Sequence, residues 1–341
     1  LSKKQKSFTK HSLDALYKLQ TNDAFWHGVF GGFYLPSLRD NAYKYLLEIE
    51  QTRITENINF ELLDINEDGY DELKVLTSDL SVLISKKHGA QLIEFGSLSA
   101  LFNWQNTIMR REEAYHSKII DINKKHNDKK NTSIVTIHNQ EKEVDDSLKA
   151  QLIYDYHAKN SFIDYFSLNA FTLEDFKKLT FKELGDFTKE PFMLKNKKFI
   201  REGLICLESA SYPSKLSKKY SFTRNKITLR SRFESEYQSS LYFAQEFNFH
   251  FAHHDKVTFN ARYIGDGFSE YNCDKLMIID DFTKKCLTIK SNQKCNVFAF
   301  IVNTVSESEQ NFEAIAQEIS FIFATKFSSK FKLKFSIEVS D

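Results

Sequence analysis

The sequence predicts a mainly β protein, in which a large antiparallel β-sandwich follows a short helical segment. Aromatic residues make up 14% of the chain, and phenylalanine alone accounts for 32 residues, a composition that favours half-buried pleated surfaces. Up to about residue 55 apolar residues recur every three or four positions, as on one side of a helix. Beyond that point they alternate with polar residues, as in strands with one buried face. Many strand-like runs with few helices between them favour an antiparallel sandwich, so we expect a helical segment at 1–55 and a sandwich domain at 56–341.

Two helices are expected in the first segment. One covers 9–20, and the other begins at Ser37, which with Asp40 three residues later resembles a capping box behind Pro36. One stripe of the first helix is expected to consist of Leu13, Leu16, Tyr17 and Gln20. The buried side of the second is expected to carry Tyr43, Leu46, Leu47 and Ile49.

The clearest strand is expected at the C-terminal end. Over 331–339 every second residue is apolar and the residues between are Lys, Ser or Glu, the pattern of one buried and one wet face. Further strands are expected at 58–62, 81–85, 91–95, 226–233, 247–251, 276–280, 287–290 and 297–302. A short helix is expected at 173–178, and the charged stretch 124–146 is expected to be an exposed excursion.

Charge, hydropathy and cysteine usage restrict the classes of partner. The net charge is +1, from 47 basic and 46 acidic residues, which argues against a nucleic-acid partner. No run of about 18 apolar residues is present, so no membrane span is expected, and the first ten residues lack a signal peptide. The four cysteines Cys206, Cys273, Cys286 and Cys295 lack metal-site or redox spacing, which predicts reduced thiols in a cytoplasmic protein without a cofactor.

A glycine-rich segment at 21–36 is the main candidate for chemistry. Trp26 offers a flat apolar face on which a sugar ring can stack, and Asp23 and His27 offer hydrogen bonds to hydroxyl groups. An aromatic platform with a few polar groups is typical of a ligand site. The alternative is a glycine-rich turn with a core tryptophan and a capping aspartate, and composition alone leaves both open.

Two other clusters resemble metal sites. Asp64, Asn66 and Asp68 begin like a calcium loop, but the twelfth position is Val75 rather than Glu. We therefore favour a β-turn that is rich in Asp and Asn. His250, His253 and His254 lie close to Asp255, but alternation with the neighbouring phenylalanines predicts that His250 faces solvent. No metal site is predicted.

Two charged clusters are interpreted as surface features. Glu307 and Glu309 are two residues apart and would point the same way along a strand, but an exposed acidic turn is the preferred interpretation. Arg110, Arg111, Glu112 and Glu113 are interpreted as an ion-paired surface or domain-interface cluster, whose individual pairs contribute little to stability.

The glycine-rich segment also carries a family resemblance. It resembles the last of the short sequence signatures of glycoside hydrolase family 57, which comprises 4-α-glucanotransferases and α-amylases. The matching residues are Asn22, Asp23, Phe25, Trp26, His27, Gly28, Gly31, Gly32, Tyr34, Leu35, Pro36, Leu38 and Arg39. Further stretches at 64–72, 106–116, 155–166 and 304–313 resemble later blocks of the family, although Ile301, Gln310 and Asn311 depart from its last block.

The resemblance implies part of a retaining enzyme that acts on α-1,4-glucans or maltooligosaccharides. Its nucleophilic Glu and its acid/base Asp would sit on an N-terminal barrel that this sequence lacks, in the same polypeptide or as a separate chain. Residues 1–55 would close the barrel unit, and 56–341 would form a sandwich of the galactose-mutarotase type. Asp23 and Trp26, with Asn22 and His27, would line the sugar cleft, and no residue of this chain would be catalytic.

Two functions remain open from the sequence. Transferase activity is preferred over hydrolysis because an aromatic cleft favours an acceptor sugar over water at the covalent intermediate. The rival is a stand-alone, non-catalytic module that binds glucan or has a structural role. The first residue is Leu1 rather than Met, so we expect a processed start or an N-terminal portion outside this sequence.

Overall fold

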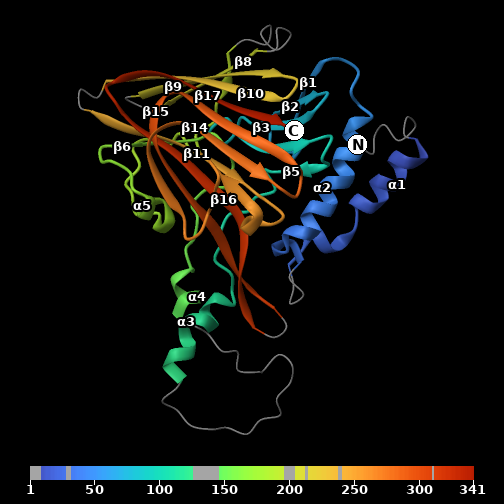
Figure 1. Cartoon of the computed structure of the whole chain (residues 1–341), viewed down its shortest axis with the longest axis horizontal. Helices are drawn as coiled ribbons and strands as arrows, with labels where there is room; N and C mark the ends of the chain where they lie inside the picture. The colour runs from blue at the N-terminus through green and yellow to red at the C-terminus, as the bar shows by residue number, and fades with distance from the viewer. Residues whose placement is uncertain are drawn as a thin grey trace.

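A computed structural model of the chain describes residues 9–27, 32–125, 146–195, 204–211, 214–236, 240–308 and 311–341. Two α-helices come first, α1 (Lys10–Leu19) and α2 (Pro36–Gln51), with the short 3-10 helices η2 (Asn22–Phe25) and η3 (Gly32–Tyr34) between them. Both α-helices lie together beside the β structure (Figure 1). They pack through Ala15, Leu16 and Ile49, and Leu47 of α2 is also buried, as predicted.

Two details of these helices differ from what the sequence patterns indicated. Tyr17 is 57% exposed, because the preceding residue, Leu16, occupies the side of α1 that meets α2. Ser37 does not cap α2, since the helix already begins at Pro36 and its N-cap residue Leu35 makes no side-chain hydrogen bond. Proline suits this first position because an N–H group there would have no partner within the helix.

The rest of the described chain is mainly β and its paired strands are antiparallel, as predicted. A five-stranded sheet has the order β1-β2-β3-β4-β5, with bounds β1 (Ile58–Leu63), β2 (Glu72–Thr77), β3 (Leu80–Ser85), β4 (Gln91–Ser97) and β5 (Phe102–Asn103). A twelve-stranded sheet contains β6 (Ile163–Ser167), β7 (Met193–Leu194), β8 (Leu204–Ser211), β9 (Ser214–Thr223), β10 (Lys226–Ser235), β11 (Leu241–Phe249), β12 (Val257–Phe259), β13 (Arg262–Tyr263), β14 (Phe268–Asp280), β15 (Lys285–Glu307), β16 (Phe312–Phe327) and β17 (Lys330–Ser340).

The long strand β15 joins two layers of the twelve-stranded sheet. Its first part pairs with β17 from Cys286 to Ser291, and β17 continues into β10, β9, β8 and β7, which we call the first layer. Its later part pairs with β16 from Asn296 to Glu307, and β16 continues into β11 and β6, which we call the second layer. A strand that passes from one sheet to another is a common way to close a sandwich corner.

Phenylalanine rings fill the space between the two layers. Phe247 of β11 lies 5.6 Å, centroid to centroid, from Phe335 of β17, and Phe249 lies 5.9 Å from Phe95 of β4. The five-stranded sheet therefore shares this core with the sandwich. Aromatic pairs at such distances add to the stabilisation from buried apolar area, which gives the high phenylalanine content a structural role.

Helices α3 (His116–Lys125) and α4 (Asp146–Ala150) extend away from the sandwich (Figure 1), and the 3-10 helix η5 (His254–Lys256) precedes β12. Helix α5 (Leu173–Lys178) forms where a short helix was predicted, with a capping box between Thr172 and Asp175. Most of the predicted excursion, 126–145, lies outside the described residues. No helix in the described part of the chain is both long and apolar enough to cross a membrane.

Candidate functional site

The predicted sugar-binding residues lie in and just after η2, between the two α-helices. Asn22 and Asp23 are exposed, and Trp26 is 49% exposed. The backbone closes behind them, where the N–H of Phe33 donates to the carbonyl oxygen of Trp26 at 3.0 Å. Gly32 is required at this closure because its φ is +54° and a Cβ there would lie 2.0 Å from the same oxygen. Gly28 and Gly31 lie outside the described residues.

The exposure of Trp26 contradicts the alternative of a core tryptophan. The chain's other tryptophan, Trp104, is fully buried, and its indole N–H donates to Asp280 at 3.1 Å. Phe25, beside Trp26, is 65% exposed. Two neighbouring exposed aromatic rings on a backbone closed by glycine form a platform that can accept an apolar ring face.

His27 is held by aromatic rings. Its imidazole lies 4.8 Å from the ring of Tyr34, edge to face, and 5.6 Å from the ring of Tyr115. The hydroxyl of Tyr34 donates to Glu113 Oε1 at 2.5 Å, and burial together with this carboxylate raises the pKa of Tyr34. The segment that precedes α3 therefore fixes the position of His27, whose role toward a ligand stays a prediction.

A groove of about 350 Å³ opens beside Phe25. Its walls are mostly apolar, and its polar groups come from α2, β4 and the stretch after β5. The lining residues are Leu19, Ala24, Phe25, Arg39, Ala42, Tyr43, Leu46, Glu94, Asn106, Thr107 and Ile108. Apolar walls with a few polar groups are typical of small-ligand sites. No local sequence pattern indicates this groove, since its lining comes from segments that are far apart in the chain.

A buried arginine fixes α2 to the sandwich. Arg39 is 8% exposed, and its guanidinium donates to Asn106 Oδ1 at 2.7 Å and to Gln317 Oε1 at 2.8 Å. It also donates to the carbonyl oxygen of Phe33, within the turn behind Trp26. One side chain of the signature therefore connects the aromatic platform, α2 and strand β16.

The prediction that His250 faces solvent is wrong. Its side chain does leave the strand on the face opposite Phe249, but α2 covers that face and leaves His250 only 1% exposed. Nε2 of His250 lies 3.1 Å from Asp40 Oδ2, and Nδ1 lies 2.8 Å from the carbonyl oxygen of Gln317. His250 thus belongs to the interface between α2 and the second layer.

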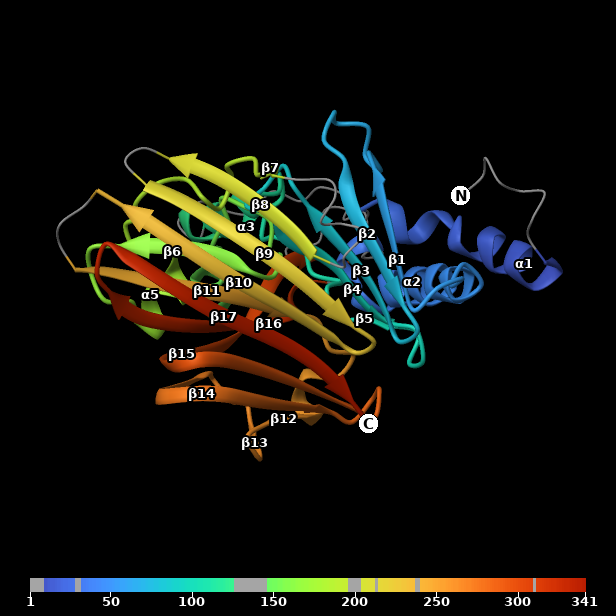
Figure 2. The ribbon, with the colours of Figure 1, turned by 90° about the horizontal axis from the view of Figure 1, so that it is seen from above.

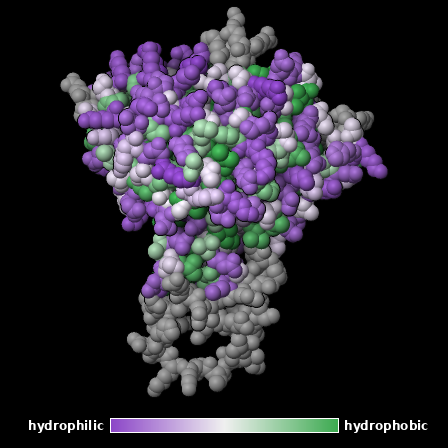
Figure 3. All heavy atoms as spheres, viewed as in Figure 1, coloured by the Kyte–Doolittle hydropathy of each residue, from purple (hydrophilic) through white to green (hydrophobic). Residues whose placement is uncertain are grey.

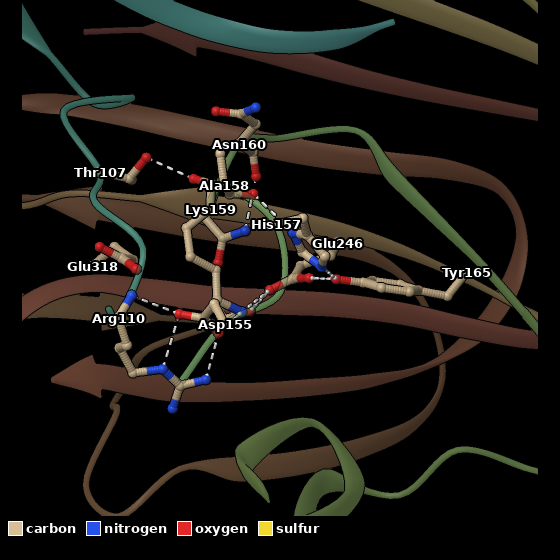
Figure 4. Close-up of polar contacts among 12 residues, drawn as sticks. Thr107, Arg110, Asp155, His157, Ala158, Lys159, Asn160, Tyr165, Glu246 and Glu318 are labelled. Carbon is tan, nitrogen blue, oxygen red and sulfur yellow. Dashed lines mark hydrogen bonds and ion pairs between the residues drawn. The ribbon is translucent and has the colours of Figure 1, made fainter. Parts of the chain in front are cut away.

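A buried ionic cluster lies further along the same face of the second layer (Figure 4). Nζ of Lys159 lies 3.0 Å from Glu246 Oε1 on β11 and 3.5 Å from Asp155 Oδ1. Arg110 donates to both oxygens of Asp155, at 2.6 and 3.0 Å. Of the two alternatives for this charged cluster, surface or domain interface, the surface one is wrong for Arg110, which is ion-paired but only 6% exposed. Its partner Asp155 comes from a distant segment that the sequence did not pair with it.

The protonation states of this cluster follow from its burial. Burial disfavours the charge of Asp155, but Lys159 and Arg110 outweigh this effect and lower its pKa to about 2. Glu318 has no comparably close cation, so burial, with the charge of Asp155, raises its pKa to about 8. Near pH 7 two cations then face the anions of Asp155 and Glu246, while Glu318 is neutral. Balanced, buried charges of this kind hold the segments around residues 106–116 and 155–161 against the sheet.

Two hydroxyl groups also donate hydrogen bonds to the carboxylate of Glu246. The hydroxyl of Tyr165 donates to Glu246 and lies 2.7 Å from Nε2 of His157, and Ser320 donates to Glu246 at 2.6 Å. Lys159 and Glu246 are not among the residues that the sequence patterns indicated. The available signal was a charged residue, Glu246, inside a strand of buried phenylalanines.

The acidic turn between β1 and β2 matches its prediction. The carboxylate of Asp64 accepts from the backbone N–H groups of Asp68 and Gly69, both at 3.0 Å, as in turns that are stabilised by an Asp side chain.

The second acidic cluster lies at the end of β15. Glu307 pairs with Lys118 at 3.1 Å, and Glu309 lies outside the described residues. In the described ranges, no group of three His, Cys, Asp or Glu side chains is placed to hold a metal ion.

Comparison with known proteins identifies the family. A model of the C-terminal domain of α-amylase/4-α-glucanotransferase matches residues 64–337, and a model of the middle domain of the same proteins matches residues 1–53. The chain belongs to this α-amylase/4-α-glucanotransferase family.

Individual relatives agree with the family models. A 4-α-glucanotransferase from Thermococcus litoralis is 26% identical over 326 residues, which cover 94% of this chain and 47% of the relative. α-Amylase 1 from Dictyoglomus thermophilum is 27% identical over 325 residues, covering 91% and 46%. The crystal structure of the Thermococcus litoralis enzyme superposes with a TM-score of 0.75 at 21% identity, over 97% of this chain and 46% of that one. The chain thus spans slightly less than half the length of the relatives it matches.

Proposed function

We propose that this chain is the C-terminal part of a retaining enzyme that acts on α-1,4-glucans, either a 4-α-glucanotransferase or an α-amylase. The family membership supports this proposal, because the relatives carry these two names and match over nearly the whole chain. The catalytic Glu and Asp would then belong to the part of the enzyme that precedes this sequence, as the resemblance to glycoside hydrolase family 57 implies. A retaining mechanism needs two carboxyl groups about 5–5.5 Å apart across the reacting sugar.

In this proposal the signature segment supplies one wall of the sugar cleft. Trp26 is the stacking platform, Asp23 binds a hydroxyl group beside the reacting ring, and Asn22 and His27 lie next to them. The observation that carries the proposal is the exposure of Trp26, whose carbonyl oxygen is bound by the backbone N–H of Phe33 beside Gly32, while Arg39 donates to the carbonyl oxygen of Phe33. A rigid, exposed ring binds a ligand without a large loss of conformational entropy.

Transfer is favoured over hydrolysis in this proposal. An acceptor sugar must displace water at the covalent intermediate, and neighbouring exposed rings such as Phe25 and Trp26 favour a sugar over water. The four cysteines are unpaired, and we propose a cytoplasmic enzyme on that ground.

Replacing Trp26 by alanine in the barrel-containing enzyme tests the platform. We expect kcat/KM for maltoheptaose to fall by about tenfold or more, because ring stacking is lost, while the melting temperature stays nearly constant, because little buried area is removed. Asp23→Asn should also lower kcat/KM with little loss of stability, since the charge-assisted hydrogen bond disappears. Both quantities are to be measured on the same samples.

The matched control is Tyr271→Ala, which removes an aromatic ring that is 68% exposed on β14. It should leave kcat/KM unchanged. If the Trp26→Ala enzyme has the melting temperature and the kcat/KM of the parent, the proposed role of Trp26 in sugar binding is wrong.

A further inference from the structure

The far side of the first layer carries a row of cations, which we call the cationic face: Lys219, Arg230, Arg232, Lys332 and Lys334. The strands that present it lie side by side in Figure 2. Hydrophilic residues cover much of the molecular surface that is visible in Figure 3. Arg230 on β10 is directly opposite Lys219 on β9 and Lys334 on β17. In the next row Arg232 is opposite Lys332.

The close spacing of these cations lowers the stability of the sheet. Directly opposed side chains on antiparallel strands have their Cβ atoms about 5 Å apart, and like charges there destabilise the sheet. Arg232 pairs with Glu234 at 2.6 Å. For the other four, no carboxylate among the described residues lies within ion-pair distance. The chain as a whole has a net charge of only +1. The positive charge of the cationic face is therefore offset by acidic residues on other parts of the molecule.

The cationic face lines a hollow of about 480 Å³. Ser217 and Asn292 lie between the cations, and Glu208 also lines the hollow. The hydroxyl of Ser217 donates to Glu208 at 3.0 Å and Asn292 Oδ1 accepts from the backbone N–H of Lys334 at 2.7 Å, which leaves the Ser217 oxygen as an acceptor and the Asn292 amide group as a donor for a ligand hydroxyl. None of the described lining residues is aromatic. Single-stranded nucleic acids are usually bound by cations interleaved with aromatic rings. Membrane-surface sites usually add apolar anchors to their cations. The composition of the hollow instead fits a hydroxyl-rich ligand with phosphate groups.

We propose that the cationic face binds phosphate monoesters on phosphorylated α-glucans. This inference rests on the proposed function, which supplies the glucan. A phosphate monoester carries nearly two negative charges near pH 7, Arg230 can hold it through two hydrogen bonds, and Lys219 and Lys334 lie on either side to neutralise it. The face is separate from the platform at Trp26 and would hold the polymer while the cleft acts on another part of it.

Affinity electrophoresis of the full chain tests the proposal. One gel contains amylopectin with phosphate monoesters and the other the same amylopectin after phosphatase treatment. We expect stronger retardation in the first gel, and a dependence on salt, because bound phosphate displaces counterions. The double variant Arg230→Gln/Lys334→Gln should weaken binding in the phosphorylated gel by about tenfold. The control Lys182→Gln/Lys256→Gln makes the same change of charge at exposed lysines elsewhere and should bind as the parent does.

The remaining outcomes separate this inference from the proposed function. Equal retardation in the two gels, or an unaffected Arg230→Gln/Lys334→Gln variant, would overturn the phosphate site. Retardation by a single-stranded oligonucleotide or by anionic vesicles, but not by phosphorylated amylopectin, would overturn it as well. Trp26→Ala should weaken binding in both gels by the same factor. If it has no effect while the dependence on phosphate persists, the platform fails and the phosphate site stands.

Discussion

At the scale of single residues, Glu318 is a buried carboxyl group that keeps its proton near neutral pH. It lies on β16 beside Lys159 and Asp155, and one of its oxygens accepts from the backbone N–H of Ile108 at 3.4 Å. If Glu318 were ionised it would be a third anion beside two cations, and its protonation avoids the large cost of an unpaired buried charge. The neutral state of Glu318 is therefore part of what holds the segment after β5 in place.

The protonation of Glu318 makes stability depend on pH. Its pKa is about 8 in the folded chain against an ordinary value of 4.5, so between these values the folded state keeps a proton that the unfolded state has released. The free energy of unfolding must then fall as pH rises through this window and level off above it. Glutamine at position 318 cannot titrate. We therefore expect the melting temperature of Glu318→Gln, measured relative to that of the parent, to be higher at about pH 9 than at about pH 5.

Calorimetry at the two pH values checks this prediction. Glu56→Gln is the control, because Glu56 is exposed and its substitution should change the melting temperature equally at both. A difference between Glu318→Gln and the parent that is independent of pH would show that Glu318 is already ionised at neutral pH.

Residue burial was the property that the sequence predicted least well. Alternation correctly placed His250 on the face opposite Phe249, yet the side chain is buried because α2 returns over that face. Arg110 is also buried by a distant part of the chain, because the segment that carries Asp155 lies against its guanidinium group. The period of a strand determines the direction of each side chain, whereas its burial depends on which distant segment covers it.

At the scale of elements, α2 is attached to the β structure through polar groups at both of its ends. Arg39 and Asp40 at its start contact Asn106, Gln317 and His250. At its other end Glu50 pairs with Lys74 of β2 at 2.6 Å. Directional contacts at both ends of a helix fix its rotation and its register, and the aromatic platform precedes this helix directly.

Arg39→Lys tests the attachment of α2. Lysine keeps the charge but cannot reach Asn106 and Gln317 together, and unsatisfied buried groups cost about 1–3 kcal/mol each. We expect faster amide hydrogen exchange in η3 and α2, with unchanged exchange in β11. Arg53→Lys is the control, because Arg53 likewise donates to two side-chain oxygens, here those of the Glu61 carboxylate, but at the surface. Unchanged exchange in α2 of the Arg39 variant would refute this role.

The prediction of elements from sequence succeeded where a local period is strong. The alternation at 331–339 predicted β17, and the short helix expected at 173–178 corresponds to α5. The start of α2 was expected near Ser37 and lies at Pro36, but the capping role of Ser37 was wrong because Pro36 can itself begin a helix. The groove beside Phe25 and the cationic face depend on strand register and on distant neighbours, which no local pattern contains.

At the scale of the whole molecule, the family comparison predicts that this chain lacks glucan-processing activity by itself. The relatives it matches are about twice as long, and the carboxyl pair of a retaining mechanism is proposed to lie in their other half. We expect the purified chain to leave maltoheptaose unchanged, as judged by chromatography of the oligosaccharides. The appearance of longer or shorter oligosaccharides at a rate that Trp26→Ala lowers would place catalysis within this chain.

The path of β15 between the two layers also has a consequence for the order of folding. Strands β14, β15 and β16 follow one another in sequence and pair as neighbours, so closing each hairpin orders only a short length of chain. The ladder between β10 and β17 instead joins Lys226 to Glu338 and must close a long loop. Contacts between distant segments form slowly for this reason. We therefore expect the β14–β15–β16 meander to form first as the template, and the sandwich to close last when β17 is added between β15 and β10.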